Sequence, residues 1–387
     1  MATRIAVAQT PLTGGAAGIE LARSIVGSLG ASPHALIVFA TPDQDHRALL
    51  RALQRECNPG VMVGCSSAGE FTSDAAGVGM TCAAALVSDE MEFTAALGRG
   101  LRDDRQRAAA DLVGSFRGVV AHEMPHRSAL VLTDALAGFA DDLVDTLTVL
   151  TGGAYRFFGG GAGDDARFQR THVFHGVDVH EDAAVALEIL STKPIGVGVQ
   201  HGWTPSETRF RVTEAEGMSL RSLNAEPAVG VFDAHAAATG QAFDHEQPIP
   251  FFLHNVLGVQ SSEGYRLRVP LAVGEDGSVA CAADVPRGAT SCIMSTSAAD
   301  AADAAASAVR SALSQLEGNA PAGAFFFDCV ATRLRLGQQF GEELAAVQRE
   351  LGDVPFAGFN TYGQIAQSEG QFNGFHNCTA VVCVIPA

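Results

Sequence analysis

The feature that most constrains the fold of this chain is an internal similarity that occurs three times. Each copy reads as an apolar strand, a helix, a strand that runs into a Gly-rich turn, and a further strand. The first strands are ALIVFAT (35–41), ALVLTDA (129–135) and AFFFDCVATR (324–333), and the turns lie in VMVGCSSAGEF (61–71), YRFFGGGAGDD (155–165) and PFAGFNTYGQIAQ (355–367). The distance from strand to turn is similar each time: 35 to 64, 129 to 159 and 324 to 358. The recurrence predicts a duplicated unit.

The strands and helices of these units predict an α/β (α+β) fold. The apolar strands are short and nearly continuous, which is typical of strands covered on both faces. The helical stretches carry charge on one side: Arg47, Arg51 and Arg55 recur at every fourth position and predict a solvated helix face. Repeated strand-helix-strand-strand units are therefore expected to form layered sheets with helices.

A different pattern lies between the second and third copies. Residues 196–217 read as two strands, residues 226–240 as a helix that stops at a glycine, and residues 266–288 as a hairpin. The Ala-rich run at 298–316 predicts a further helix by propensity. We expect two domains, residues 1–222 and residues 223–387.

Charge and cysteine usage exclude several classes of function. Asp and Glu number 43 against 25 Lys and Arg, a formal charge of -18, so a nucleic-acid or anionic-membrane partner is not expected. The 8 cysteines form no CxxC pair, and we interpret them as buried free thiols. With no signal-peptide pattern and no apolar run long enough to span a bilayer, the chain is expected to be cytoplasmic.

The 22 phenylalanines stand against only 3 tyrosines and 1 tryptophan, and many lie in the strands and turns of the repeats. They suggest an aromatic-walled site where the turns converge. The phenylalanines in question are Phe157, Phe158, Phe325, Phe326, Phe327, Phe356, Phe359, Phe372 and Phe375.

Several motifs in register resemble the FIST family (F-box and intracellular signal transduction proteins). The matching pieces are GCSSAGEF (64–71), FFGGGAGDD (157–165), GVGVQHGW (196–203), VPRG (285–288), CVATR (329–333), AGFNTYGQIA (357–366) and FHNCT (375–379). The resemblance implies an N-terminal FIST domain over 1–222 and a C-terminal FIST domain over 223–387. One departure is Gln364, where the family usually carries Glu.

The resemblance implies ligand sensing rather than catalysis. Stand-alone bacterial members are similar to NosP-type proteins, which bind haem b, sense nitric oxide and report to a histidine kinase or to a cyclic-di-GMP enzyme such as a diguanylate cyclase. The older inference for the family is a haem-free sensor of a small metabolite such as an amino acid. Either output would pass through a separate partner protein, and a homodimer is one option that the sequence leaves open.

A haem site requires a histidine at the iron and a large apolar cavity. Covalent attachment is excluded because no CxxCH occurs. The order of preference for the iron ligand is His201, beside the sole tryptophan, then His376, after Phe375, then His254, after two phenylalanines. The alternative for each is an ordinary core or surface histidine.

A haem-free site would draw on the Gly-rich turns. The glycines up to Gly161 permit close backbone approach, and the carboxylates of Asp164 and Asp165 suit an amino group, a cation or a helix cap. Arg333 can pair with a ligand carboxylate or with Glu70. We therefore take these residues as candidate ligand contacts.

A hydrolase is the third hypothesis, with Cys65 or Ser66 of GCSSAGEF as nucleophile. The segment lacks the GxSxG pattern, and no base can be assigned to Cys65 from spacing. Cys65 and Ser66 therefore join the candidate ligand contacts, and an enzymatic role is disfavoured.

Overall fold

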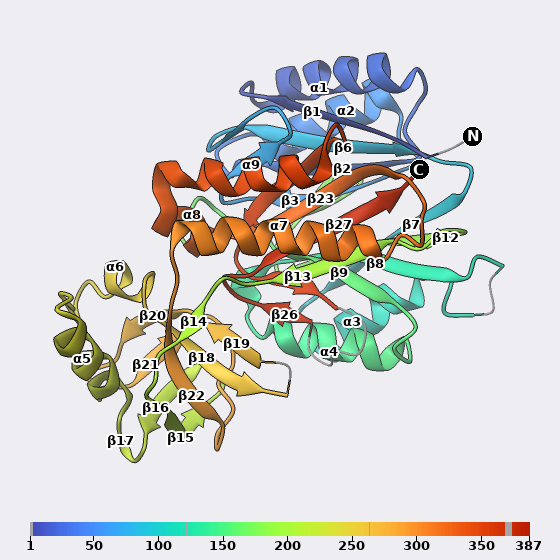
Figure 1. Cartoon of the computed structure of the whole chain (residues 1–387). Coiled ribbons are helices and arrows are strands. Elements are labelled where there is room, and N and C mark those ends of the chain that lie inside the picture. Colours follow the sequence, from blue (N-terminus) through green and yellow to red (C-terminus); the bar gives the residue numbers. More distant parts are fainter. Residues whose placement is uncertain (1–2, 121–122, 263, 368–373) are drawn as a thin grey trace.

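The computed structural model describes residues 3–120, 123–262, 264–367 and 374–387. It contains four β-sheets, three with six strands and one with nine. The three six-stranded sheets and the helices on them make up most of the molecule, and the nine-stranded sheet lies to one side (Figure 1).

Each six-stranded sheet is built around one of the three sequence repeats. The first repeat comprises β1 (Arg4–Thr10), α1 (Gly14–Leu29), β2 (Ala35–Ala40), α2 (His46–Cys57), β3 (Val61–Ser66), β4 (Glu70–Thr72), β5 (Ala76–Gly77) and β6 (Thr81–Val87). The second comprises β7 (Met91–Arg99), α3 (Arg105–Gly114), β8 (His126–Thr133), η1 (Ala135–Ala137), α4 (Ala140–Leu150), β9 (Arg156–Gly161), β10 (Val173–His175), β11 (Asp178–His180) and β12 (Ala183–Ser191). The third comprises β13 (Gly196–Gln200), α7 (Ala298–Ser314), β23 (Pro321–Cys329), α8 (Val330–Leu336), η2 (Gly337–Gln339), α9 (Phe340–Leu351), β24 (Phe356–Thr361), β25 (Gln364–Ala366), β26 (Phe375–His376) and β27 (Ala380–Pro386).

The strand pairing confirms the predicted duplication. In every repeat the central strand (β2, β8 or β23) pairs in parallel with the strand that precedes the turn and antiparallel with the closing strand. The unit is one strand and one helix longer than the sequence pattern indicated. β1, β7 and β13 each pair with the closing strand of their own repeat, and α1, α3 and α7 follow them in the repeat.

The hairpin after each Gly-rich turn leaves its own repeat and joins the next sheet. β4 pairs with β24 of the third repeat, β10 pairs with β3 of the first, and β25 pairs with β9 of the second. The exchange is cyclic, so the strand order of the three sheets is equivalent. Each sheet is therefore completed by a neighbour, and the three turns are brought into contact with one another.

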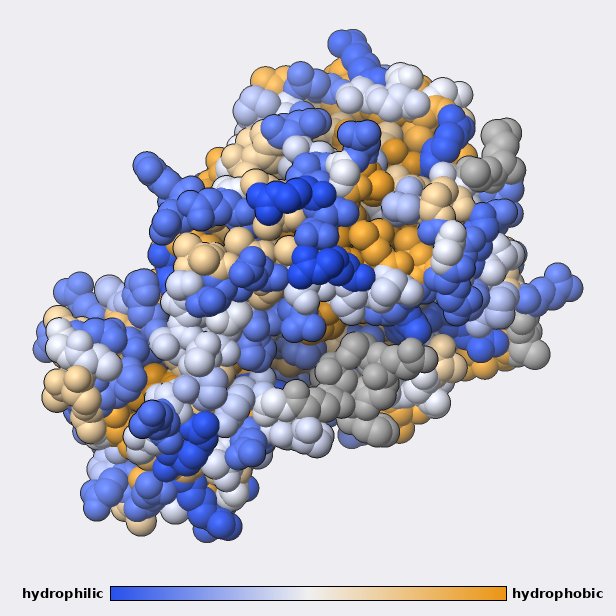
Figure 2. All heavy atoms as spheres, in the orientation of Figure 1, coloured by the Kyte–Doolittle hydropathy of each residue, from blue (hydrophilic) through white to orange (hydrophobic). Residues whose placement is uncertain are grey.

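The sheets enclose a common apolar core. Its members include Phe39, Leu130, Phe158, Phe327 and Phe359, one or more from each repeat. The outer face of each sheet packs on its own helices, which form three further clusters. On the face drawn in Figure 2, hydrophilic residues are spread over the surface and apolar residues show in patches between them.

The phenylalanines predicted to wall a site are core residues. Phe158, Phe325, Phe327 and Phe359 belong to the central core, and Phe157, Phe326, Phe356 and Phe375 pack under the outer helices. Phe372 lies outside the described residues. The aromatic excess is thus explained by packing between three sheets, where large rigid side chains fill the space.

Residues 204–295 form an insert within the third repeat, between β13 and α7. Its elements are β14 (Thr204–Pro205), β15 (Phe210–Glu216), β16 (Ser219–Leu223), β17 (Glu226–Pro227), α5 (Ala228–Thr239), α6 (Ile249–Phe252), β18 (Val256–Ser261), β19 (Gly264–Arg268), β20 (Pro270–Val273), β21 (Val279–Cys281) and β22 (Thr290–Ser295). The predicted helix that stops at glycine is confirmed as α5, with Gly240 left-handed at its end. The predicted hairpin is confirmed as β20 and β21.

The expected boundary after residue 222 falls inside β16, which pairs with β15 before it and β21 after it. The sheets divide the chain differently, into a body of three repeats and the insert. The division at 222 stays a prediction of where the two sequence domains meet.

Candidate functional site

The site lies where the three Gly-rich turns meet at the carboxyl ends of β3, β9 and β24. Backbone hydrogen bonds join them: Gly163 N donates to Ser66 O at 3.0 Å, Ala68 N to Asn360 O at 3.1 Å, and Tyr362 N to Gly161 O at 3.1 Å. The exchanged hairpins hold the turns in this arrangement. Side chains from all three repeats are therefore neighbours here, as the sequence analysis expected for the turns.

Glu70 begins β4 and is fully buried at this junction. Burial raises the pKa of its carboxyl to about 8, against the opposing effects of Ser67 and the Met80 amide. One carboxyl oxygen contacts the Ser67 hydroxyl, and that hydroxyl also lies 3.1 Å from Ala40 O. Because a hydroxyl has one proton, protonated Glu70 can donate to Ser67 while Ser67 donates to Ala40.

Three polar side chains beside Glu70 have atoms left without partners. Nε of Arg333, Nδ2 of Asn360 and Oδ1 of Asp165 are all buried, and none has a hydrogen-bond partner within the described chain. Buried polar atoms in native proteins are almost always hydrogen-bonded, and each exception calls for an explanation such as a ligand. These atoms offer two donors and one negatively charged acceptor.

Two of these side chains, Arg333 and Asp165, belong to one electrostatic cluster with Glu70. Burial lowers the pKa of Arg333, and the carboxylate of Asp165 opposes this shift most strongly, followed by Glu70 in its ionised form. Burial raises the pKa of Asp165, and Arg333 and Arg167 oppose this shift. The guanidinium stays protonated at any ordinary pH, so the cluster combines a fixed cation with a carboxylate.

Gly69 has no side chain, and this allows Asn360 and Arg333 to lie close to its backbone. A Cβ at this position would lie 2.7 Å from Oδ1 of Asn360 and 3.2 Å from Nε of Arg333. Gly69 also has a φ of 128°, which L-residues rarely adopt. The glycine is therefore required both by the backbone and by the proximity of the two polar side chains.

Glu70, Arg333 and Asn360 line a pocket of about 470 Å³, and Asp165 is not among the described residues that line it. Its remaining walls include the apolar side chains of Phe71, Val78, Leu334 and Phe340. This volume lies within the roughly 300–1,000 Å³ of small-molecule sites, and an apolar wall with a few convergent polar groups is their usual composition.

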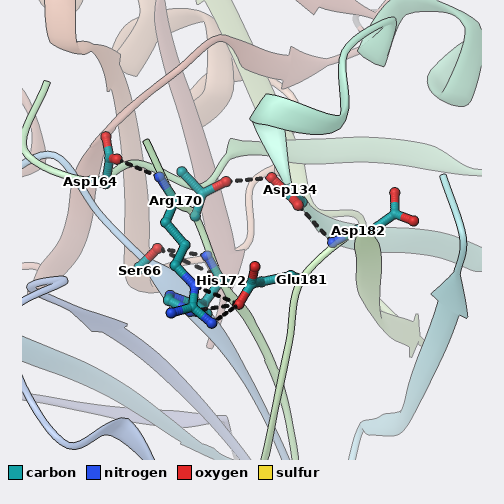
Figure 3. Close-up of polar contacts among 8 residues, drawn as sticks. Ser66, Asp134, Asp164, Arg170, His172, Glu181 and Asp182 are labelled. Atoms are coloured by element: carbon teal, nitrogen blue, oxygen red, sulfur yellow. Dashed lines mark hydrogen bonds and ion pairs between the residues drawn. The ribbon is translucent and has the colours of Figure 1, made fainter. Parts of the chain in front are cut away.

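Asp164, unlike its neighbour Asp165, is fully used in holding the turn. Its carboxylate accepts the backbone amides of Phe168, Gln169 and Arg170 at 2.8, 2.7 and 2.8 Å, and it also accepts the hydroxyl of Tyr362. Figure 3 shows the carboxylate directed at the amide of Arg170. The sequence left open whether this carboxylate contacts a ligand or caps the local backbone, and in this structure it caps the backbone of the turn.

Ser66, Cys65 and Gly161 also have structural contacts. The Ser66 hydroxyl accepts the amide of His172 at 2.9 Å, a contact that Figure 3 shows beside the Arg170–Glu181 ion pair. Cys65 faces the central core, and burial raises the pKa of its thiol well above the usual value. A Cβ on Gly161 would lie 2.8 Å from Cβ of Ala135. None of the three is among the described residues that line the pocket.

Gln364, the departure from the family pattern, makes its hydrogen bonds within the third repeat. Its side-chain amide donates to the Thr361 hydroxyl at 2.6 Å, and its carbonyl oxygen accepts the amide of Thr379 at 3.4 Å. The residue is fully buried. It stabilises the third turn, and the described pocket lining does not include it.

The three histidines ranked as iron ligands lie around the junction of the insert with the third repeat. Both ring nitrogens of His201 are engaged, Nε2 with Tyr265 O at 3.1 Å and Nδ1 with the Trp203 amide at 3.3 Å. The cavity it lines has about 10 Å³, the space of a single water. Nε2 of partly buried His376 lies 3.1 Å from Ala366 O, and His254 is exposed. As placed, these side chains do not fit haem.

A larger pocket, of about 720 Å³, lies between the second repeat and the insert. None of the described residues that line it is a histidine.

Across the described ranges, no three His, Cys, Asp or Glu side chains are grouped so as to hold a metal ion. All 8 cysteines are buried and free, as expected. Among the described helices, none has the length and apolarity needed to span a bilayer.

Two residues of the site, Asn360 and Tyr362, were not singled out by the sequence analysis. Both lie in AGFNTYGQIA, which was recognised as a motif only as a whole. A polar Asn within an apolar strand was the available signal, since buried Asn needs partners. The aromatic ring of Tyr362 stacks on Phe168, with centroids 4.5 Å apart.

Comparison with protein families finds two matches that together cover most of the chain. The FIST N domain matches residues 34–226, and the FIST C domain matches residues 234–367. The gap between them lies just after the predicted boundary at 222 and inside the insert. No curated protein matches the chain.

Proposed function

Because the chain belongs to the FIST family of signal-transduction sensor domains, we propose that it senses a small zwitterionic metabolite such as an amino acid. The observation that carries the proposal is the set of unpartnered buried atoms on Arg333, Asn360 and Asp165 beside the 470 Å³ pocket. The ligand carboxylate would accept from Arg333 and Asn360, and its ammonium would donate to Asp165.

The charge state of the pocket favours a zwitterion over a simple anion or cation. Glu70 is neutral at pH 7 because burial raises its pKa to about 8. The formal charge that remains in the lining is the guanidinium of Arg333. The carboxylate of Asp165 lies outside the lining, where Arg333, Arg167 and Asp43 act on it. One positive and one negative ligand group would balance them, and the apolar wall formed by Phe71 and Phe340 would contact the ligand side chain.

A sensing mechanism follows from the location of the pocket. The pocket is lined by the β4–β5 hairpin of the first repeat and, in the third repeat, by Asn360 and residues of α8, η2 and α9. That hairpin pairs with β24 of the third repeat, so the ligand would lie between two repeats. Binding can therefore favour one arrangement of the repeats, provided the ligand binds that arrangement more tightly. The output would pass to a separate signalling protein, and a histidine kinase or cyclic-di-GMP enzyme stays a prediction.

The test is a thermal-shift screen of single amino acids, each paired with its amine and acid analogues. A ligand at one hundred times its Kd stabilises a protein by about 2.7 kcal/mol, a shift that is easily measured. An amino acid is expected to stabilise more than either analogue. Arg333→Gln should weaken the binding of that amino acid at least about tenfold, since a charge-assisted pair is lost.

The matched control is Arg310→Gln, which removes an exposed arginine that pairs with Glu350. It should leave the response unchanged. An amino acid that stabilises wild type and Arg333→Gln equally would refute the assigned site, and a complete absence of response would refute the ligand class.

The haem and nitric oxide hypothesis stays a prediction with support from the resemblance alone. The visible absorption spectrum tests it independently of the metabolite site. A Soret band that is lost in His201→Ala would support haem at the first-ranked histidine, whereas protein that takes up no added haemin would exclude it.

A further inference from the structure

The pocket of about 720 Å³ lies at the junction of body and insert, away from the metabolite pocket just described. The second repeat contributes its η1–α4 segment, with Leu136 and Phe139. The insert contributes the β15–β16 turn, with Met218, and the end of β21 with the residues after it. The two parts of the molecule meet on the side of α4 and β26 in Figure 1.

The lining of this pocket is mainly apolar, with two exposed aromatic rings. Phe139 and Phe168 are 40% and 47% exposed, although large apolar side chains usually avoid solvent. Both have a left-handed backbone, with φ of 53°, which is unfavourable for a bulky residue. The guanidinium of Arg105 already lies 4.8 Å from the centroid of the Phe139 ring, so this ring can receive a cation.

Several carboxylates around the pocket form ion pairs within the described chain. Asp141 lies 3.1 Å from buried Arg268, Asp142 lies 3.4 Å from Arg105, and Glu216 lies 2.6 Å from Arg221. Asp284 has no such partner: its Oδ1 is buried and makes no hydrogen bond within the described chain. Arg268 donates to the backbone oxygen of Asp284 at 2.6 Å, and Arg268 and Arg105 act on the Asp284 carboxylate at longer range, against the raising of its pKa by burial.

We propose that this pocket is a second ligand site, which takes an organic cation with a flat apolar ring. The ring would pack against Leu136, Met218 and Leu271, and the cationic group would pair with Asp284. An anion would face the Asp284 carboxylate, whose buried oxygen Oδ1 makes no hydrogen bond within the described chain, so the site discriminates by charge. The two pockets have no described lining residue in common, although Tyr362 of the third turn lines this one.

The test is calorimetric titration with tryptamine and with indole-3-propionate, which carries the same ring but the opposite charge. Wild type should bind tryptamine at least about tenfold more tightly than the acid. Asp284→Asn should bind tryptamine and the acid with nearly equal affinity, so that this roughly tenfold preference is lost. Asp276→Asn, an exposed carboxylate in the β20–β21 turn, is the matched control and should bind as wild type does.

Leu271→Trp keeps the test decisive if Asp284→Asn is unstable, because an added ring should fill the pocket and abolish tryptamine binding. Arg333→Gln should bind tryptamine normally, which separates this site from the metabolite site. Tryptamine that fails to bind wild type, or that binds Asp284→Asn as tightly as wild type, would overturn the proposal.

Discussion

Two neighbouring aspartates, Asp164 and Asp165, have opposite surroundings at the junction of the turns. Asp164 accepts three backbone amides and a tyrosine hydroxyl, whereas Asp165 has a buried oxygen without a partner. A carboxylate that accepts several amides organises a loop. A carboxylate with a free buried oxygen is available for a ligand.

The pair allows structural and ligand roles to be separated. Asp164→Asn exchanges an acceptor oxygen for a donor that faces backbone amides, and should lower the free energy of unfolding by about 1–3 kcal/mol. Asp165→Asn should leave stability nearly unchanged and weaken amino-acid binding. Urea denaturation and calorimetry on both variants measure the two effects, and equal stability losses would contradict the division.

Glu70 gives the molecule a pH dependence of stability. Its pKa of about 8 in the folded state exceeds its unfolded value near 4.5, so the folded state retains a proton that the unfolded state releases. The stability of wild type should therefore fall as pH rises from about 4.5 to about 8, by up to about 1.4 kcal/mol per pH unit from this group.

Glu70→Gln removes this titration while keeping a neutral side chain of similar shape. Urea denaturation at about pH 5 and about pH 8 should show a smaller loss in the variant than in wild type. An identical loss in both proteins would mean that Glu70 is ionised in the folded state at neutral pH.

At the scale of elements, the approach of a strand to its helix is set by glycine. A Cβ on Gly198 of β13 would lie 1.9 Å from Ala308 O in α7, and one on Gly98 of β7 would lie 2.2 Å from Ala108 O in α3. The second and third repeats thus use the same device. The helix can pack directly on the strand backbone only where no side chain intervenes.

Gly198→Ala should accordingly destabilise the protein by about 1–3 kcal/mol, through forced separation of β13 and α7. Gly230→Ala in α5 is the matched control, because nothing lies within 4 Å of its Cβ position. It should raise stability by roughly 0.5–1 kcal/mol through helix propensity. Thermal unfolding would contradict this account if the two substitutions had the same sign.

At the scale of the whole molecule, the exchanged hairpins make the three repeats interdependent, whereas the insert is attached locally. The two ends of the insert are adjacent: the Thr296 hydroxyl donates to Gly202 O at 2.8 Å, and β14 pairs with β22. The insert has its own apolar cluster, and a second cluster joins it to the third repeat.

Replacing residues 204–295 with a short Gly-Ser linker should therefore leave a folded body of reduced stability. It should retain amino-acid binding and lose tryptamine binding. A fragment of residues 1–222 should lack a cooperative transition, because its strands β4 and β9 would lose their partners β24 and β25. Circular dichroism during heating distinguishes the cases, and a cooperative 1–222 fragment would contradict the interdependence.

The repeats were predictable from sequence because each short apolar strand and each Gly-rich turn is a local pattern. The hairpin exchange was not, since it pairs β4 with a strand almost 300 residues later in the chain. Of the candidate ligand contacts, Glu70, Asp165 and Arg333 come together at the site, while Cys65 faces the core. A residue type predicts what a side chain can do, but its partners are set by tertiary contacts.

The central claim is that Arg333, Asn360 and Asp165 hold a zwitterion. The most direct measurement is a crystal structure with the amino acid that gives the largest thermal shift. The account predicts its carboxylate within hydrogen-bond distance of Nε of Arg333 and Nδ2 of Asn360, and its ammonium beside Oδ1 of Asp165. Ligand bound elsewhere, with these three atoms still unpartnered, would contradict it.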